Sequence, residues 1–402
     1  MHSEKKNILY IGGFELPDKN AAAHRVIANG KMLAELNYDV FYLAVQDTKD
    51  TTLKVEDTKS TFEGFTYWSL KYPRNFIEWY KYIADADQII DVIENHLPAL
   101  PYAIIAYDYP AVALAKLLSY CRKKQILLIG DTTDWYKVYR GNLLFRIIKS
   151  FDTNYRMRWL HNHLDGMITV SRYLYDYYKK RAANVLFLPP LVDIAEKKWE
   201  DAGNNLSEEL RLVYAGQPFS KGSGKKDRID KVLFALSEAI KKEPINFKLL
   251  VIGITQDYYL ENYGINTIPD NIKDKVIFLG RLSHKEVLKE IQIADYSIFI
   301  RDDYRVTRAG FPTKFVESIT CGTPVLTNSS SNIDEYLIEG EFGFLLNTSN
   351  QQRLTDSLLN AIAQPKEEII KMKLACKRSQ LFDYHQFLNS MDEFLKKLRD
   401  SN

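Results

Sequence analysis

The stretch 7–13, NILYIGG, opens the pattern that decides the fold of this chain: a short apolar run that ends in two glycines. A helical pattern over residues 24–36 follows, and then a second apolar run, VFYLAV, at 40–45. The first half repeats this alternation with further apolar runs at 102–107, 125–129 and 166–170. Strands that are apolar on both faces and alternate with helices predict a parallel sheet covered by helices. The glycine turn lacks the GxGxxG spacing of the dinucleotide fingerprint.

A second series of strands and helices follows the stretch 188–193, LPPLVD, and the polar run 196–209, which together predict a linker. The apolar runs of this series lie at 210–216, 247–252, 276–279, 296–300 and 324–327. A length of 402 residues suffices for two to three domains. We therefore predict an α/β protein with two doubly wound, Rossmann-like domains that face a cleft. In such sheets, ligands bind beyond the carboxyl ends of the strands.

The composition is that of a globular protein. Hydrophobic residues make up 46% of the chain and charged residues 26%, which excludes a disordered protein. The formal net charge of +2 argues against a nucleic-acid partner. The three cysteines, Cys121, Cys321 and Cys376, are too widely spaced for a disulfide framework or a zinc site, which fits a reducing compartment. No run approaches the roughly 18 apolar residues of a transmembrane helix, so we expect a cytoplasmic protein.

The most informative stretch is 309–317, AGFPTKFVE, which predicts a helix that starts at Pro312 and Thr313. The start of a helix presents unpaired backbone N–H groups and a positive dipole end, and therefore suits an anion. Lys314 adds a positive charge in the first turn, where a carboxylate is normally preferred. Glu317, about one turn further on, is placed to accept hydrogen bonds from sugar hydroxyls. The alternative is an ordinary helix start with a solvated lysine and glutamate.

A second candidate anion site is 214–227, YAGQPFSKGSGKKD, which follows a strand and precedes a predicted helix. Gly216 and the adjacent Lys225 and Lys226 suit a phosphate group. A flexible, solvated loop is the alternative, but two such sites in one domain favour a diphosphate ligand. A third and weaker signal is Gly280-Arg281, where a strand ends beside groups that could contact a nucleobase.

In the first domain, the candidate residues follow the first and fourth predicted strands. Gly12 and Gly13 leave room for a ligand near the backbone, and His24 starts the following helix. Asp131 and Asp134 are placed to orient an acceptor hydroxyl or to share a proton. The alternative for these two carboxylates is a helix N-cap and a surface acid. The pairs Asp85/Asp87 and His161/His163 are interpreted as a solvated face and a structural pair, so no metal site is predicted.

The segment 135–160 differs in composition from the rest of the chain. It contains six basic residues and only one acidic residue, Asp152. Aromatic and aliphatic residues lie between the basic residues. Such a pattern suits an anionic membrane surface. A partly buried helix pair explains it equally well, and a nucleic-acid surface explains it less well. The basic residues are Lys137, Arg140, Arg146, Lys149, Arg156 and Arg158.

The three candidate ligand-binding motifs of the second domain, at 309–317, 214–227 and 280–281, carry a family resemblance. With them the chain resembles the retaining, nucleotide-sugar-dependent glycosyltransferases of the GT-B fold, specifically family 4. The resemblance spans nearly the whole chain and is strongest over 278–343. It implies that the C-terminal domain, over 206–380, binds a nucleoside diphosphate sugar, and that the N-terminal domain, over 1–195, binds the acceptor. It also implies that the last helix, within 381–402, crosses back onto the first domain.

The resemblance assigns roles to particular residues. Lys226 would hold the diphosphate, Glu317 would bind the ribose hydroxyls, and Gly280-Arg281 would lie beside the base. The chain departs from the family at two positions, with Ala309 in place of the first of two glutamates and Gln217 in place of a phosphate-binding arginine. Nearby arginines could supply the missing charge: Arg301, Arg305 and Arg308.

The sequence therefore predicts a retaining glycosyltransferase that moves a sugar, such as a hexose, from a nucleoside diphosphate to a hydroxyl acceptor without a metal or another cofactor. The expected setting is surface polysaccharide or glycolipid assembly, with a saccharide or lipid-linked acceptor, at the inner face of a membrane. Glu317, Asp131 and His24 are the predicted catalytic residues. The alternatives are a nucleotide-sugar 2-epimerase of the same fold and a non-catalytic subunit that binds sugar nucleotides.

Overall fold

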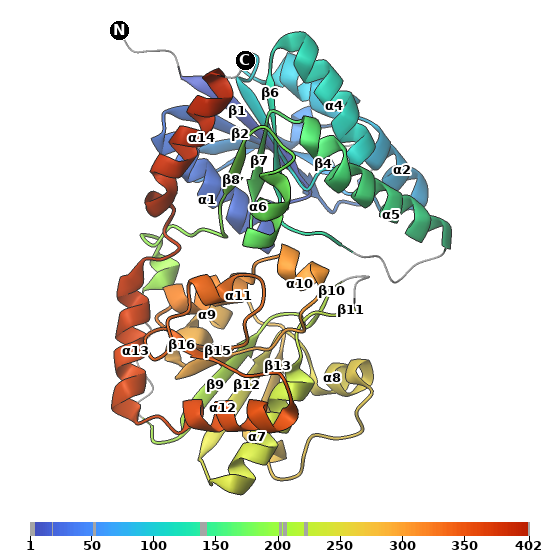
Figure 1. Ribbon diagram of the computed structural model, residues 1–402. Coiled ribbons are helices and arrows are strands. Elements are labelled where there is room, and N and C mark those ends of the chain that lie inside the picture. Colours follow the sequence, from blue (N-terminus) through green and yellow to red (C-terminus); the bar gives the residue numbers. More distant parts are fainter. Residues whose placement is uncertain are drawn as a thin grey trace. The chain divides into compact units, whose positions relative to one another are not determined.

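The computed structural model describes residues 5–17, 19–50, 54–136, 143–200, 203, 207–220 and 224–400. The chain divides into two compact units (Figure 1). The first unit comprises Met1–Asp193 and Asp383–Asn402, and the second comprises Ile194–Phe382. Each unit is a mainly parallel sheet with helices on it, so the predicted α/β, Rossmann-like architecture is confirmed.

The first unit is built on an eight-stranded sheet with the order β3-β4-β2-β1-β5-β6-β7-β8. All neighbouring strands are parallel except the edge pair β3 and β4. Ile8 of β1 pairs with Val40 on one side and Ala103 on the other. The strands are β1 (Lys6–Gly12), β2 (Tyr38–Gln46), β3 (Ser60–Phe62), β4 (Phe65–Lys71), β5 (Ala103–Tyr107), β6 (Leu127–Thr132), β7 (Gly166–Thr169) and β8 (Val185–Phe187).

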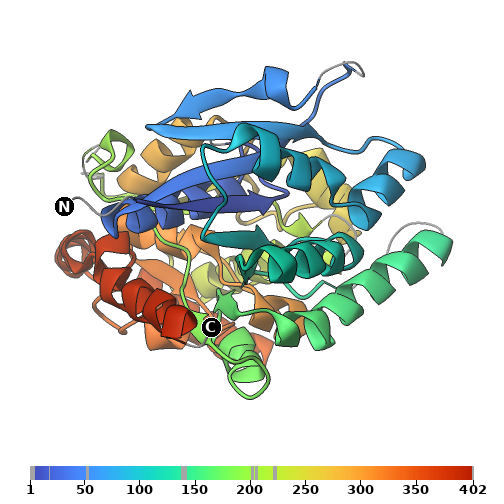
Figure 2. The same cartoon turned by 90° about the horizontal axis from the view of Figure 1, so that it is seen from above.

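Helices cover both faces of this sheet, which explains why its central strands are apolar throughout (Figures 1 and 2). One face packs on α1 and α14, whose side chains join those of the strands in a single core. On the other face, α4 packs against both α2 and α5. The helices are α1 (Ala21–Glu35), α2 (Phe76–Ala84), α3 (Asp87–Asp91), α4 (Ala111–Lys124), α5 (Leu143–Arg158), α6 (Arg172–Tyr178) and α14 (Leu388–Asp400).

The last helix returns to the first unit, as the sequence predicted, because its apolar side chains complete the core there. Phe394 packs so closely on β7 that a Cβ atom at Gly166 would lie 2.7 Å from its ring. The helix begins later than the predicted residue 381, since 384–387 form a 3-10 turn. Gln380, with a φ of 50°, ends the preceding helix.

The second unit is built on a six-stranded, fully parallel sheet with the order β13-β12-β9-β14-β15-β16. A small hairpin of β10 (Phe219–Ser220) and β11 (Gly224–Lys225) follows the first strand. The strands are β9 (Leu210–Ala215), β12 (Phe247–Ile252), β13 (Val276–Gly280), β14 (Tyr296–Ile298), β15 (Val325–Thr327) and β16 (Gly343–Leu345). The helices are α7 (Ile229–Lys242), α8 (Gln256–Tyr263), α9 (His284–Ile293), α10 (Arg305–Ala309), α11 (Thr313–Thr320), α12 (Gln351–Ile362) and α13 (Lys366–Ser379).

In both sheets the strand order reverses once, and the reversal fixes where a ligand fits. The reversal lies between β1 and β5 in the first unit and between β9 and β14 in the second. Ligands of doubly wound sheets bind beyond the carboxyl ends of the strands at such a point. The residues that follow these four strands are therefore the first candidates for a functional site. Among the described helices, none is long and apolar enough to cross a membrane.

Candidate functional site

A buried carboxylate shared by two cations lies at the strand reversal of the second unit. The side chain of Asp227 is only 1% exposed, and its Oδ2 accepts a hydrogen bond from Lys314 Nζ at 2.5 Å. Its Oδ1 accepts from Arg301 Nε at 2.8 Å. The hydroxyl of Tyr214, on β9, donates to Oδ2 at 2.7 Å. Two cations and one carboxylate leave one surplus positive charge in a buried place.

The protonation equilibria of this cluster reflect that surplus. Although burial opposes ionisation, Lys314 and Arg301 hold the pKa of Asp227 well below its usual range. Burial lowers the pKa of Lys314 to about 8, with repulsion from Arg301 and Lys226 in the same direction and attraction to Asp227 against it. Arg301 Nη1 is buried and has no hydrogen-bond partner among the described residues. Because an incompletely paired buried cation is costly, the cluster favours an anionic ligand.

Glycines at the strand ends bring the backbone close to this cluster. Gly216 follows β9 with a φ of +136°, and a Cβ atom there would lie 2.9 Å from Lys314 Nζ. Gly253 follows β12 with a φ of +111°, and its Cβ would lie 2.4 Å from the Gly216 carbonyl oxygen. Any side chain at either position would therefore strain the backbone and displace its neighbours. The first turn of α11, which carries Thr313 and Lys314 after Pro312, is thus next to Gly216.

The two adjacent lysines have different surroundings. The backbone N–H of Lys226 donates to the Pro218 carbonyl at 2.7 Å, and its charge acts on Lys314. Lys225 Nζ instead lies over the ring of Tyr263, 4.7 Å from the ring centroid. The structure therefore joins Lys226 to the cluster and gives Lys225 a cation–π partner.

A second group of predicted residues follows β13. Gly280 ends this strand with a φ of +65°, and Arg281 is exposed. His284 begins α9, and its Nε2 lies 3.2 Å from Glu317 Oε1 on α11. The side chains of His284 and Glu317 are both partly exposed. The sequence analysis missed His284, since a single histidine after a strand carries no motif.

Sequence reasoning also missed Asp227, the centre of the cluster, although it directly follows the two lysines that were singled out. Arg301 had been proposed only as a substitute charge. The structure brings together the following predicted donor-site residues: Gly216, Lys226, Arg301, Pro312, Thr313 and Lys314.

In the first unit, Asp131 is held by buried protein partners, and its catalytic role stays a prediction. It is 1% exposed at the end of β6, and Arg25 Nη2 donates to its Oδ1 at 2.8 Å. Tyr10 donates to Oδ2 at 2.5 Å. Arg25 also donates to the backbone carbonyls of Leu188 and Pro189. Asp131 is thus engaged by a buried arginine of α1, a partner that no spacing in the sequence reveals.

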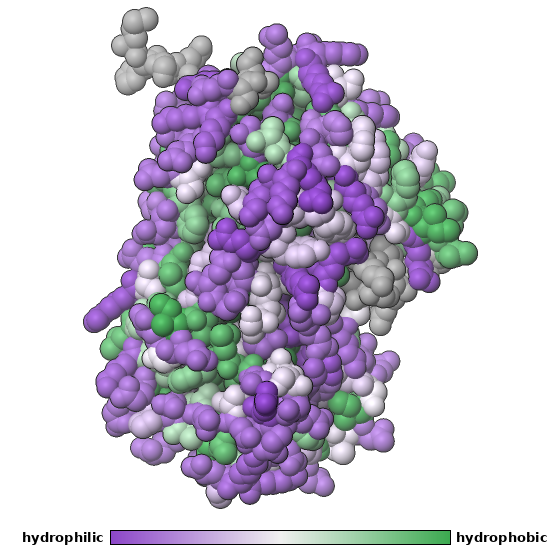
Figure 3. Space-filling model, in the orientation of Figure 1, coloured by the Kyte–Doolittle hydropathy of each residue, from purple (hydrophilic) through white to green (hydrophobic). Residues whose placement is uncertain are grey.

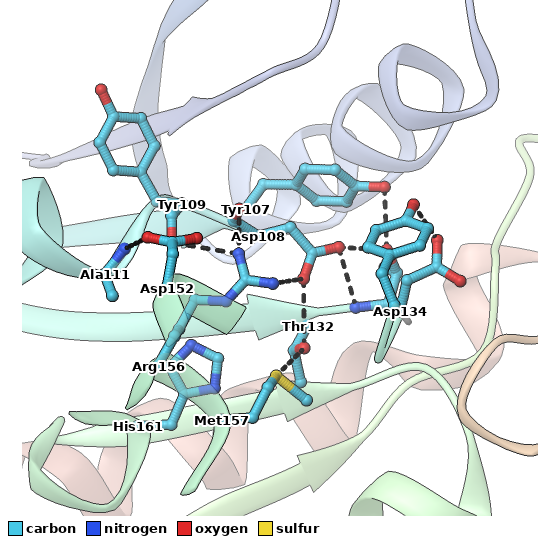
Figure 4. Close-up of polar contacts among 12 residues, drawn as sticks. Tyr107, Asp108, Tyr109, Ala111, Thr132, Asp134, Asp152, Arg156, Met157 and His161 are labelled. Atoms are coloured by element: carbon cyan, nitrogen blue, oxygen red, sulfur yellow. Dashed lines mark hydrogen bonds and ion pairs between the residues drawn. The ribbon is translucent and has the colours of Figure 1, made fainter. Parts of the chain in front are cut away.

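Asp134, the other predicted carboxylate, does lie in a candidate site (Figure 4). Its Oδ2 accepts from the hydroxyl of Tyr136 at 2.5 Å. Its Oδ1 is buried and has no hydrogen-bond partner among the described residues. A hydroxyl of a ligand would supply the missing donor, because a buried carboxylate oxygen without a partner is costly.

The neighbouring acid is Asp108, which follows β5 at the strand reversal and was missed by sequence analysis. Its φ of 43° is in the left-handed region, a conformation that functional sites often hold. Its Oδ2 accepts from the hydroxyl of Thr133 at 2.6 Å, and Arg156 Nη2 of α5 lies 3.6 Å from Oδ1. Arg156 also donates to the backbone carbonyls of Asp108 and Tyr109 (Figure 4).

Burial raises the pKa of Asp108 to about 6, and the charge of Asp134 acts in the same direction. Arg156 and the hydrogen bond from Thr133 oppose this rise. Two carboxylates that affect each other at a ligand-binding edge are typical of a functional site. Asp108 and Asp134 are therefore the candidates for the carboxylate pair that the sequence analysis placed at Asp131 and Asp134.

The remaining acceptor-site predictions concern β1 and α1. At Gly12, a Cβ atom would lie 2.8 Å from Tyr107 Cβ, so glycine allows β1 and β5 to end side by side. A Cβ at Gly13 would meet only the hydroxyl of Tyr82, at 3.8 Å, so this turn is open. His24 is half-buried in the first turn of α1, which begins at Ala21 because Asn20 caps it. No group of three His, Cys, Asp or Glu side chains suited to a metal occurs among the described residues.

Comparison with known proteins gives a family for part of the chain. Residues 219–375 match the family of glycosyl transferases group 1. This match bears out the resemblance to glycosyltransferases that the motifs indicated. The matched segment contains Asp227, Arg301, Lys314 and Glu317, so it includes the charged cluster. No curated protein matches the chain.

Solved structures support the fold along the whole chain. A sucrose-phosphate synthase from Thermosynechococcus elongatus has a TM-score of 0.67 and 13% identity over 99% of this chain and 100% of its own. A glycosyltransferase from Rickettsia africae has a TM-score of 0.67 and 14% identity over 100% of both chains. An Anabaena protein in complex with UDP and glucose has a TM-score of 0.60 and 14% identity over 98% of this chain and 100% of its own. The fold is the GT-B fold.

We predict that Asp131→Asn destabilises the protein, since it leaves Arg25 buried without a charged partner. The expected loss in the free energy of unfolding is about 3–5 kcal/mol, measured by urea denaturation. The matched control is Asp392→Asn, which removes an exposed partner of Lys396 and should change stability by less than about 0.5 kcal/mol. Equal stability of the two variants would contradict the structural role of Asp131.

A second prediction concerns pH. Because the pKa of Asp108 is higher in the folded chain than in the unfolded chain, the folded state binds more protons between pH 3.8 and about 6. This group therefore favours folding at pH 4 and loses that contribution as pH rises through about 6. The change that Asp108→Asn causes in the free energy of unfolding should consequently be more positive at pH 7 than at pH 4, by up to about 3 kcal/mol. Urea denaturation of wild type and variant at both pH values measures this, and an identical difference at both would refute it.

Proposed function

We propose that this protein is a glycosyltransferase that moves a sugar from a nucleoside diphosphate to a hydroxyl acceptor. The observation that carries the proposal is the surplus positive charge around Asp227 at the strand reversal of the second unit. A diphosphate is the anion that fits two converging features there, the buried Lys314 and Arg301 and the helix start at Thr313. The cluster lies inside the segment that matches the glycosyl transferases group 1 family.

The donor would be held by groups with distinct roles. Lys226, Lys314 and the backbone N–H groups at Thr313 would contact the diphosphate, and the ligand charge would keep Lys314 protonated above its pKa of about 8. Glu317 would accept hydrogen bonds from the ribose hydroxyls, with His284 fixing one carboxylate oxygen. Gly280 and the exposed Arg281 would flank the base.

The acceptor would bind the first unit at the ends of β1, β5 and β6. Asp134 Oδ1 would accept the hydrogen bond of an acceptor hydroxyl, because this buried oxygen has no partner among the described residues. The open turn at Gly13 and the half-buried His24 would border the same ligand. Asp108 accepts a hydrogen bond from the hydroxyl of Thr133, and it would thereby position Asp134, the next residue in the chain.

We propose transfer with retention of configuration. The acceptor oxygen forms a bond to the anomeric carbon on the face from which the diphosphate leaves, and the bond from that carbon to the diphosphate oxygen breaks. The acceptor proton passes to the leaving diphosphate, so no protein base is required. Lysine, arginine and the helix start of α11 would stabilise the charge that develops on the leaving group. The acceptor of such a reaction would be a saccharide or glycolipid of a surface polysaccharide.

Two other functions are distinguished by products. A nucleotide-sugar 2-epimerase would convert a labelled donor into its epimer without an acceptor. A binding subunit without activity would bind the donor and release no nucleoside diphosphate, an outcome that Ala309 in place of a family glutamate would explain. The test of transfer is release of nucleoside diphosphate and labelled glycoside from a panel of donors and acceptors.

For the donor site, Glu317→Ala should weaken binding of the nucleoside diphosphate by about 1.5–3 kcal/mol, because hydrogen bonds to an ionised group are lost. Lys226→Ala should weaken it as well, through a lost phosphate contact. Calorimetry with UDP, GDP and ADP measures both effects, and Glu238→Ala, at a partly exposed position on α7, is the matched control. Unchanged affinity in both site variants would rule out this donor site.

For the acceptor site, Asp134→Asn should lower kcat/KM for the acceptor at least tenfold while the Kd for the nucleoside diphosphate stays within about twofold. A fold-change of ten corresponds to about 1.4 kcal/mol, the scale of one hydrogen bond to a charged group. Steady-state kinetics at saturating donor, with calorimetry beside it, separates the two effects. A variant with normal acceptor kinetics would remove Asp134 from the site.

We further predict that transfer needs no divalent metal, since the cations near Asp227 can neutralise the diphosphate. Turnover measured in excess chelator should equal turnover with added magnesium or manganese. Loss of all turnover in chelator, restored by either metal, would contradict this prediction.

A further inference from the structure

An apolar surface on the first unit has no part in the donor or acceptor site. It is formed by one face of α2 and the outer face of α5, and we call it the α2–α5 face. Figure 3 shows apolar atoms gathered over this part of the unit. Ile77 is 69% exposed, Leu143 71% and Phe151 65%. The further large apolar residues that are exposed on it are Phe76, Tyr80, Leu144, Ile147 and Trp159.

The two helices form one continuous surface. Trp79 of α2 and Phe145 of α5 contact each other with ring centroids 5.0 Å apart. Along α5, aromatic rings stack at four-residue intervals, with 5.8 Å between the centroids of Phe151 and Tyr155 and 5.2 Å between Tyr155 and Trp159. A row at this spacing lies along one side of a helix. Monomeric soluble proteins rarely expose a contiguous apolar surface of this kind without a partner for it.

The charges of the α2–α5 face select the partner. The same two helices carry exposed cations at Lys81, Arg146 and Arg158. The two acids of these helices are both engaged elsewhere: Glu78 accepts from Lys71 Nζ, and the buried Asp152 accepts from the backbone N–H of Ala111. The face therefore combines exposed aliphatic and aromatic groups with positive charge, which is the combination that anionic lipid attracts.

The structure also corrects the composition of the basic segment that the sequence analysis singled out. Arg156 is buried against the Asp108 loop and cannot contribute to a surface. Lys137 and Arg140 lie outside the described residues. In their place, α2 contributes Lys81 and three exposed apolar side chains, which the sequence analysis had not connected with this segment.

We propose that the α2–α5 face binds the surface of an anionic lipid bilayer. Apolar and aromatic side chains would enter the headgroup region, and Lys81, Arg146 and Arg158 would contact lipid phosphates. A second copy of the chain fits less well, because a two-fold contact would bring the same cations together. This proposal does not depend on the glycosyltransferase activity, since it concerns a surface that carries no proposed donor or acceptor residue.

The inner side of α5 gives this surface a relation to the candidate acceptor site. Asp152, Thr153, Arg156 and Met157 are buried on that side, and Arg156 binds the loop at Asp108. One helix therefore carries the lipid-binding row outside and supports the acceptor site inside. A lipid-linked acceptor would then reach the site from the surface to which the protein is bound.

The test is co-sedimentation of the full chain with vesicles of phosphatidylglycerol mixed with phosphatidylcholine, and with vesicles of phosphatidylcholine alone. We expect binding to the anionic vesicles that falls as salt rises, and little binding to the neutral ones. The double variants Ile147→Glu with Phe151→Glu, and Arg146→Glu with Arg158→Glu, should each lower the partition coefficient at least tenfold. These side chains are exposed, so both variants should fold, and circular dichroism checks this.

The matched control is Leu100→Glu, which changes a side chain of 51% exposure in the loop before β5 and should bind as wild type does. Absence of binding by wild type at low salt, equal binding to neutral vesicles, or unchanged binding by both double variants would overturn the proposal. Light scattering of the free protein adds one more outcome. If the wild-type protein is a dimer and the double variant Ile147→Glu with Phe151→Glu is a monomer, the partner of this face is a second copy of the chain instead. Calorimetry with nucleoside diphosphate should give the wild-type Kd in every variant, so this proposal can fail without the donor site failing.

Discussion

The ion pairs of Asp227 with Lys314 and Arg301 are the interaction on which the candidate donor site depends. They join a loop before α7, the segment that follows β14 and the first turn of α11, and the hydroxyl of Tyr214 adds a contact from β9. A single carboxylate cannot neutralise two buried cations. One positive charge of the cluster therefore remains without a counter-ion, and an anion bound at this edge of the sheet would neutralise it.

In the first unit, the imbalance of charge has the opposite sign. Asp131 is fully engaged by Arg25, and that pair fixes α1 to the end of β6 and to the Leu188–Pro189 backbone. Asp108 and Asp134 instead share too little positive charge, and burial raises the pKa of Asp108 to about 6. An excess of cations suits a phosphate-bearing donor, whereas an excess of carboxylate suits a ligand rich in hydroxyls. The electrostatics of the two units thus agree with the two kinds of substrate that sugar transfer needs.

Helix α5 lies between the candidate acceptor site and the exterior. Its buried Arg156 supports the loop at Asp108, while the stacked rings of Phe151, Tyr155 and Trp159 follow its outer side. A helix that served only the core would expose polar residues on that side. The exposed aromatic row therefore indicates a binding partner, and the exposed cations on α2 and α5 indicate that this partner is anionic.

The sequence by itself determined the two α/β units and the return of the last helix, and it predicted most of the candidate donor site. Apolar runs, glycine turns and the Pro312–Glu317 motif are local signals, and backbone physics ties each to a strand, a turn or a helix start. Tertiary structure alone decided the partners of the charged groups. Arg25 and Asp131 are far apart in the chain, as are Asp227 and Lys314, and they meet because parallel strands bring their carboxyl ends to one edge. Asp108 and His284 carry no motif, and their roles follow from burial and from neighbours that only the strand order selects.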